Sequence, residues 1–135
     1  MGILWTVWPL DEQMKSWLVE TGIDYPDTKS RFPTGIEIKS ALSQLKNYDV
    51  NITDNGIGHT WQAMINKKEE AMESEWTVLN ISEYSGDEHP QKLWFEKGWE
   101  SLIHQILHNI VPYCGPLVLI ADSGDDPVII SNLAI

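Results

Sequence analysis

Apolar residues recur along this chain with two different spacings, and each spacing predicts a different kind of element. Recurrence every three or four residues predicts a helix, and alternation with polar residues predicts a half-buried strand. The clearest helix is residues 99–110, which carry six apolar residues on one face. The continuous apolar run 117–120 is typical of a strand that is covered on both faces. We expect the stretch 95–130, which holds both elements, to organise the fold.

Other strands are predicted where short apolar or alternating segments stand between turn residues. A first strand is expected at residues 3–8, where Pro9 stops it, and the segments 48–53 and 60–65 form a hairpin around Asn55-Gly56. The polar residues 66–75 are expected to cap a longer hairpin, with a short helical turn as the alternative. Three more strands are expected at 76–81, 92–95 and 127–130, the last of which pairs back onto 117–120 through the turn 122–126.

Two further helices are predicted, each with its own end signals. The first follows Pro9 and ends at Gly22, because glycine readily adopts the left-handed conformation that ends a helix. The second covers residues 35–46 and begins with a capping box formed by Thr34 and Glu37. The helix 99–110 is expected to end at Pro112 and the Gly-Pro pair that follows.

The order of the predicted elements separates runs of strands from runs of helices. Such an order is typical of an α+β fold. We therefore predict one α+β domain over residues 1–135, with a mainly antiparallel sheet of about six to seven strands. About three helices are expected to pack on one face of that sheet. At 135 residues the chain is long enough to bury a core of its own.

The chain contains seven tryptophans, which is unusual for its length. Most of them are expected in the core, because aromatic side chains bury large areas. One or two are candidates for exposed anchors at a partner interface. They stand at the following positions: Trp5, Trp8, Trp17, Trp61, Trp76, Trp94 and Trp99.

The formal net charge is −11, and residues 47–135 hold fourteen acids against four bases. This acidity argues against nucleic acid as a partner, since phosphate binding requires positive charge. It argues equally against an anionic membrane surface. Two explanations remain open, a basic protein partner or solubility alone. The single Cys114 excludes an internal disulfide and suggests a reducing compartment, and no signal peptide or membrane span is evident, so we expect a cytoplasmic protein.

Few residues suggest catalysis or metal binding. His104 and His108 have the i, i+4 spacing of two metal ligands on a helix, but Gln105 stands where a metalloprotease has its glutamate. These histidines are candidates for a metal site, although two solvent-exposed side chains are the simpler interpretation. Asp122, Asp125 and Asp126 cluster after a buried strand, where acids can bind metal or act as bases, but a polar hairpin turn is the simpler interpretation. Asp87, Glu88 and His89 include acid–base groups but belong to a turn-rich loop. We predict no catalytic residue and no cofactor.

Partner binding is predicted at two acidic segments, 83–88 and 122–126, which together carry six acids and no base. If the sheet brings both segments to one edge, they form a negative patch that attracts a basic protein. Tyr84 and Tyr113 are candidates for exposed aromatic anchors beside it. The predicted partner-binding residues are Glu83, Tyr84, Asp87, Glu88, Asp122, Asp125 and Asp126.

A small, acidic, single-domain α+β chain without a catalytic motif resembles the immunity proteins of bacterial toxin systems, including those of contact-dependent growth inhibition. The resemblance is one of class, so it assigns no role to a particular residue. It implies tight binding to a cognate toxin domain, often a basic nuclease, and steric and electrostatic blockade of its active site. Two alternatives stay open: a metal-dependent enzyme that uses His104, His108 and an acidic loop, and a structural or regulatory subunit of a larger complex.

Overall fold

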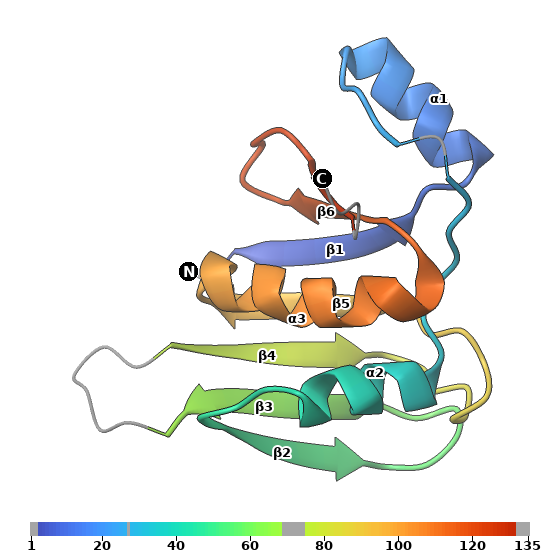
Figure 1. Cartoon of the computed structure of the whole chain (residues 1–135). Helices are drawn as coiled ribbons and strands as arrows, with labels where there is room; N and C mark the ends of the chain where they lie inside the picture. Colours follow the sequence, from blue (N-terminus) through green and yellow to red (C-terminus); the bar gives the residue numbers. More distant parts are fainter. Residues whose placement is uncertain (1–2, 27, 69–74, 132–135) are drawn as a thin grey trace.

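The computed structural model describes residues 3–26, 28–68 and 75–131. Within these residues the chain forms one sheet of seven strands together with three helices (Figure 1). This confirms the predicted α+β fold. In chain order the elements are β1 (Leu4–Pro9), α1 (Glu12–Thr21), α2 (Gly35–Ser43), β2 (Tyr48–Asp54), β3 (Trp61–Lys67), β4 (Trp76–Ile81), β5 (Leu93–Gly98), α3 (Glu100–Cys114), β6 (Leu117–Ala121) and β7 (Val128–Ile130).

The strands lie in the order β2-β3-β4-β5-β1-β6-β7, and every neighbouring pair is antiparallel. The first strand of the chain therefore lies between β5 and β6, which come from its second half. Four strands, β2 to β5, lie next to one another in chain order on one side of β1. The strands β6 and β7 form a shorter hairpin on the other side.

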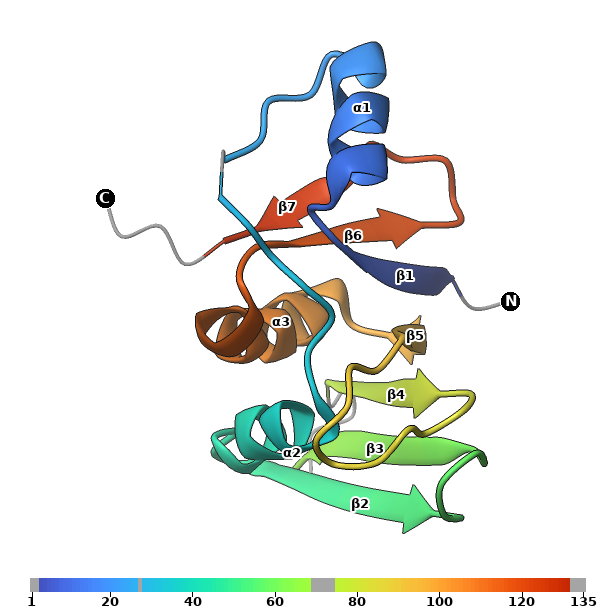
Figure 2. The same cartoon turned by 90° about the vertical axis from the view of Figure 1, so that its right-hand side faces the viewer.

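One face of the sheet is covered by α2 and α3 (Figure 2). Trp5 and Val7 of β1 point into this core, as do Leu117 and Leu119 of β6. The helix α3 supplies the longest apolar stripe to the same core. Its buried residues include Leu102, Ile103, Ile106, Leu107, Ile110 and Val111.

The helix α1 packs on the opposite face, so the expectation that all helices share one face is wrong. A second, smaller core joins Leu10 and Leu18 to Val118 of β6, with Ile120 and Ile129 beside them. Because side chains alternate along a strand, Val118 points away from the core that holds Leu117 and Leu119. The strand β6 is therefore buried on both faces, as its continuous apolar run predicts.

Two helix ends lie where the sequence predicts them, and one does not. The capping box of Thr34 and Glu37 begins α2, and Gly22 ends α1 in the left-handed conformation. The helix α3 does not end at Pro112 but passes through it to Cys114. Pro112 lies on the exposed side of the last turn, whereas Val111 and Cys114 are buried and keep that turn in contact with the core.

Tryptophan placement also differs from expectation, because only Trp5 and Trp61 are buried. Trp76 and Trp94 are half-buried, and Trp8 is exposed. These three side chains occupy strand positions that point to the second face of the sheet. Since α1 covers that face only near β6 and β7, no helix within residues 3–26, 28–68 and 75–131 lies over the part formed by β1 to β5.

Candidate functional site

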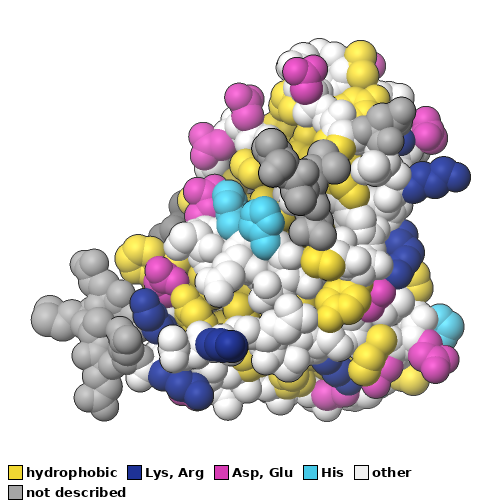
Figure 3. Space-filling view, viewed as in Figure 1, with side chains coloured by type: hydrophobic (Ala, Val, Ile, Leu, Met, Phe, Trp, Pro, Cys, Tyr) yellow, Lys and Arg dark blue, Asp and Glu magenta, His cyan; other side chains and the backbone are white. Residues whose placement is uncertain are grey.

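The two acidic segments lie at opposite ends of β1, so the condition for one shared negative patch at a single edge is not met. The turn that follows β6 meets the start of β1: the N–H of Asp122 donates to the carbonyl of Leu4 at 2.9 Å. The loop between β4 and β5 meets the other end of β1, because Thr6 pairs with Trp94 near the start of β5. Acidic side chains accordingly appear at separate ends of the molecule (Figure 3). Antiparallel pairing of β1 with both β5 and β6 imposes this separation.

The turn 122–126 holds three of the predicted partner-binding acids, and all three are exposed. Asp122 also accepts a hydrogen bond from the N–H of Leu4 at 3.1 Å, which ties the turn to β1. Asp125 accepts one from the hydroxyl of Ser123 at 2.9 Å. Asp126 is exposed at the end of the turn. These carboxylates are accessible to a partner, and their role in binding stays a prediction.

Tyr84 is not the exposed anchor that the sequence suggests, since its side chain is only 4% exposed. Its ring stacks on that of Trp61 with 5.9 Å between the centroids. Its hydroxyl donates a hydrogen bond to the carboxylate of Asp87. The side chain therefore belongs to the core under the loop 82–92. Tyr113, the other candidate anchor, is exposed at the end of α3 as predicted.

Asp87 connects the loop 82–92 to α2. Its carboxylate lies 2.7 Å from Nζ of Lys39, and that ammonium stands 5.4 Å from the centroid of the Tyr84 ring. The hydrogen bond from Lys39 is the main cause that lowers the pKa of Asp87, and burial is the main cause that raises the pKa of Tyr84. The carbonyl of Asp87 also accepts the N–H of Ile36 in the first turn of α2. Of the predicted residues in this loop, Glu83, Asp87 and Glu88 are exposed, whereas Tyr84 is buried.

The uncovered face of the sheet brings together residues that the sequence did not single out. A row of hydrogen bonds crosses three strands, from the amide of Gln62 to that of Asn80 at 2.9 Å and from Asn80 to the carboxylate of Glu96 at 3.4 Å. The outward positions include two acids and no base. They are Asp49, Asn51 and Thr53 of β2, Gln62, Met64 and Asn66 of β3, Trp76, Val78 and Asn80 of β4, Trp94 and Glu96 of β5, and Leu4, Thr6 and Trp8 of β1.

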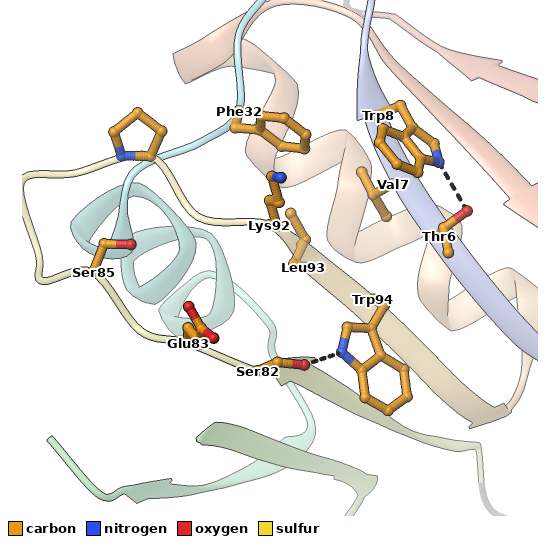
Figure 4. Close-up of a pocket in the computed structure, with 11 residues that line it drawn as sticks. Thr6, Val7, Trp8, Phe32, Ser82, Glu83, Ser85, Lys92, Leu93 and Trp94 are labelled. Atoms are coloured by element: carbon orange, nitrogen blue, oxygen red, sulfur yellow. Dashed lines mark hydrogen bonds between the residues drawn. The ribbon is translucent and has the colours of Figure 1, made fainter. Parts of the chain in front are cut away.

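At the end of β1 this face deepens into a pocket of about 480 Å³ (Figure 4). Trp8, Trp94 and Phe32 form its aromatic walls, and the rings of Trp8 and Phe32 lie 6.4 Å apart. Both indoles are held in place, since Nε1 of Trp8 donates to the hydroxyl of Thr6 and Nε1 of Trp94 to that of Ser82. The rim of the pocket carries one acid, Glu83, and one base, Lys92. Glu83 is one of the predicted partner-binding residues.

A weak signal for this pocket was present in the sequence. Along β1 the tryptophans at 5 and 8 fall on opposite faces, and so one of them had to leave the main core. Which of the two lies on an open surface depends on the position of α1, which the alternation cannot give.

The two candidate metal ligands lie on the surface of α3, where His104 is half-buried and His108 exposed. Nε2 of His104 stands 3.8 Å from the carboxylate of Glu100, one turn earlier in the same helix. Over residues 3–26, 28–68 and 75–131, no three His, Cys, Asp or Glu side chains lie close enough together to hold a metal ion. Two histidines of one helix thus have no third ligand in this part of the chain.

Cys114 has the environment of a structural thiol. It is buried beside the end of α3, and burial is the main cause that raises its pKa to about 12. A thiol with so high a pKa is almost entirely protonated at neutral pH and is a poor nucleophile. None of the described helices is long and apolar enough to cross a membrane.

The uncovered face thus offers aromatic rings, amide groups and carboxylates, which are groups suited to binding. Its pocket adds the side chains of Trp8, Trp94 and Phe32 as walls. Comparison of the chain with protein-family models, with curated proteins and with solved structures found no match.

Proposed function

We propose that this chain is a non-catalytic binding protein that holds a basic protein partner against the uncovered face of its sheet. The observation that carries the proposal is the presence of Trp8, Trp76 and Trp94 on a part of the sheet face that none of the described helices covers. Tryptophan is enriched among the residues that dominate binding energy at protein interfaces. A sheet face with exposed aromatic side chains is a typical docking surface.

The charge of this face favours a basic partner over a neutral one. Its outward strand positions carry Asp49 and Glu96 and no base, and the pocket rim adds one acid, Glu83, and one base, Lys92. The acidic segments at the two ends of β1 extend the negative charge beyond the face. Complementary charge accelerates encounter with a basic partner and disfavours acidic ones.

Separation of the acidic segments is compatible with one interface. The strand β1 has six residues, so its ends are about 17 Å apart at the rise of an extended strand. An interface of ordinary size buries about 800 Å² on each partner and is wide enough to reach both ends. The segments 83–88 and 122–126 would then contact the partner at opposite rims, with the tryptophans between them.

The specific form of the proposal is an immunity protein that neutralises a basic toxin domain, for example a nuclease, inside the cell that produces it. Support comes from the small size, the net charge of −11 and the open aromatic face. A nuclease exposes a basic cleft for its nucleic-acid substrate, because phosphate binding requires positive charge. An acidic face seated over such a cleft would exclude the substrate.

The test is a titration of this chain with the C-terminal domain of the protein that the neighbouring gene encodes. We expect a complex whose affinity falls by tenfold or more between about 50 mM and about 300 mM salt, because screening weakens attraction between exposed charges. Trp94→Ala is expected to weaken the complex by at least about tenfold, as loss of an interface tryptophan does.

Trp17→Ala is the matched control for this experiment. Trp17 lies on α1, the helix that covers the face near β6 and β7, so it is outside the open part of the face over β1 to β5. The control variant should bind like the unmodified chain. Absence of a complex at low salt would overturn the immunity proposal, and equal losses in Trp94→Ala and Trp17→Ala would show that the open face is not the interface.

A further inference from the structure

The strand β2 forms one edge of the sheet, so half of its backbone N–H and C=O groups point away from the sheet. The carbonyl of Asn47 accepts the N–H of Lys68, and the N–H of Asn55 donates to the carbonyl of Thr60. Because backbone groups alternate in direction along an antiparallel strand, the odd-numbered residues of β2 face β3. The N–H and C=O groups that point to the open edge are those of Tyr48, Val50, Ile52 and Asp54.

This edge lacks several of the features that usually prevent strands from pairing with other molecules, although it carries Asp49 and Asp54. Over its seven residues β2 contains no proline and no lysine, and its pairing with β3 has no register shift. The edge at the other end of the sheet differs. There β7 has only three residues, and Pro127 stands directly before it.

An apolar groove of about 300 Å³ runs beside the open edge, between α2 and β2. Leu42 and Leu45 line it from the helix side, and Val50 and Ile52 line it from the strand. The side chain of Ile52 is 45% exposed, although it points to the same face as the main core. A strand added to this edge would bring its own side chains against Ile52 and extend the core.

We propose that the strand added to this edge is β2 of a second copy of the chain. The pairing is antiparallel about a two-fold axis at Asn51, the middle residue of β2. In this register Val50 of each copy faces Ile52 of the other, and Tyr48 faces Asp54. The residues of both pairs form backbone N–H···O=C hydrogen bonds with each other, because all four direct their N–H and C=O groups to the open edge.

The register is complementary in charge as well as in shape. Asp49 of one copy faces Thr53 of the other, so no two carboxylates stand opposite each other. Lys46, two residues before the strand, lies at the end where Asp54 of the second copy arrives. A shift of two residues in one direction would place Asp54 opposite Val50, and a shift in either direction would shorten the ladder.

Self-association through β2 is independent of the proposed partner and responds differently to salt. Each copy carries a net charge of −11, so the copies repel at long range. Added salt screens that repulsion and strengthens the dimer. Binding of a basic protein to the tryptophan face should instead weaken with salt, and therefore failure of either proposal leaves the other testable.

The experiment is disulfide trapping with Asn51→Cys. At the two-fold axis the two introduced cysteines form a non-hydrogen-bonded pair with Cα atoms about 4.5 Å apart. A disulfide bridges Cα atoms at about 4.4–6.8 Å. Asn51 is exposed, so the substitution leaves the core unchanged, and the native Cys114 is buried and does not compete.

Thr53→Cys is the matched control on the same strand and the same face. In the proposed register the two copies of residue 53 are four positions apart, or about 13 Å, which no disulfide can span. Under mild oxidation with glutathione we expect Asn51→Cys to form a covalent dimer and Thr53→Cys to remain monomeric. Equal cross-linking of both variants would overturn the register.

Sedimentation of the unmodified chain supplies the second measurement. We expect a monomer–dimer equilibrium that shifts toward dimer as the salt concentration rises from about 50 mM to about 500 mM. Ile52→Pro removes an N–H that faces the open edge and none that bonds to β3, so it should weaken the dimer at least tenfold, whereas Ile52→Ala retains that N–H and should weaken it less. A chain that stays monomeric at every salt concentration, or that pairs β2 only with a different protein, would overturn the proposal.

Discussion

Arg31 and Glu37 form a two-pronged salt bridge, with Nη1 2.7 Å from Oε1 and Nη2 2.8 Å from Oε2. The same carboxylate accepts the N–H of Thr34 as part of the capping box that begins α2. The same guanidinium donates to the carbonyl of Tyr113 near the end of α3. One ion pair therefore ties the loop before α2 to both helices that cover the main core.

Arg31→Ala is expected to lower the free energy of unfolding by about 1–2 kcal/mol. A charge-assisted hydrogen bond contributes more than this when buried, but Arg31 is half exposed and its charge is partly screened. Lys29→Ala removes a neighbouring exposed base and should change stability by less than about 0.5 kcal/mol. Urea denaturation of the three proteins measures both effects, and equal losses in the two variants would contradict the role of the ion pair.

The effect of Arg31→Ala should also depend on pH. The hydrogen bond from Arg31 is the main cause that lowers the pKa of Glu37 below its ordinary value of 4.5. A carboxyl group with a lowered pKa stabilises the fold above its ordinary pKa, and this contribution is lost as the pH falls through the folded-state value. The difference in stability between the unmodified chain and the variant should therefore shrink below about pH 4.5. A stability difference that stays constant from neutral to acidic pH would contradict this role of the Arg31–Glu37 pair.

Gly35→Ala is expected to destabilise the protein, although alanine favours helices. A Cβ atom at this position would collide with the hydroxyl of Tyr84 and lie 3.0 Å from Cα of Asp87. Overpacking of this kind costs about 1–3 kcal/mol, which exceeds the gain in helix propensity of about 1 kcal/mol. Ser43→Ala, at the exposed end of the same helix, should be neutral or slightly stabilising. Thermal melting of both variants tests the contact, and a rise in the melting temperature of Gly35→Ala would refute it.

Trp5→Ala and Trp8→Ala should differ strongly in stability, although both change a tryptophan of β1. Trp5 is 5% exposed and belongs to the main core, so its truncation should cost about 3–5 kcal/mol. Trp8 lies on the open face, where its ring contacts Phe32, and its loss should cost about 1 kcal/mol. Denaturant unfolding compares the two, and similar losses would show that the second face is covered in solution.

Local pattern alone predicted most of the elements. The alternation in 48–53 and 60–65 and the continuous run 117–120 correspond to β2, β3 and β6 of the structure. The capping box at Thr34 and the glycine at 22 gave the correct helix ends, because a helix end depends on hydrogen bonds within a few residues. The predicted end of α3 at Pro112 is wrong, since burial of Val111 and Cys114 keeps the final turn helical around Pro112. The predicted cap of the hairpin at 66–75 falls mostly outside the described residues.

Tertiary structure alone decided where the candidate surfaces lie. Alternation shows that Trp5 and Trp8 point to opposite faces, but the path of α1 determines which face stays open. Strand order placed the segments 83–88 and 122–126 at opposite ends of β1, and packing against Trp61 buried Tyr84. The physical reason is one of range. Secondary structure follows from hydrogen bonds and side-chain spacing over a few residues, whereas exposure and proximity follow from contacts between residues far apart in the chain.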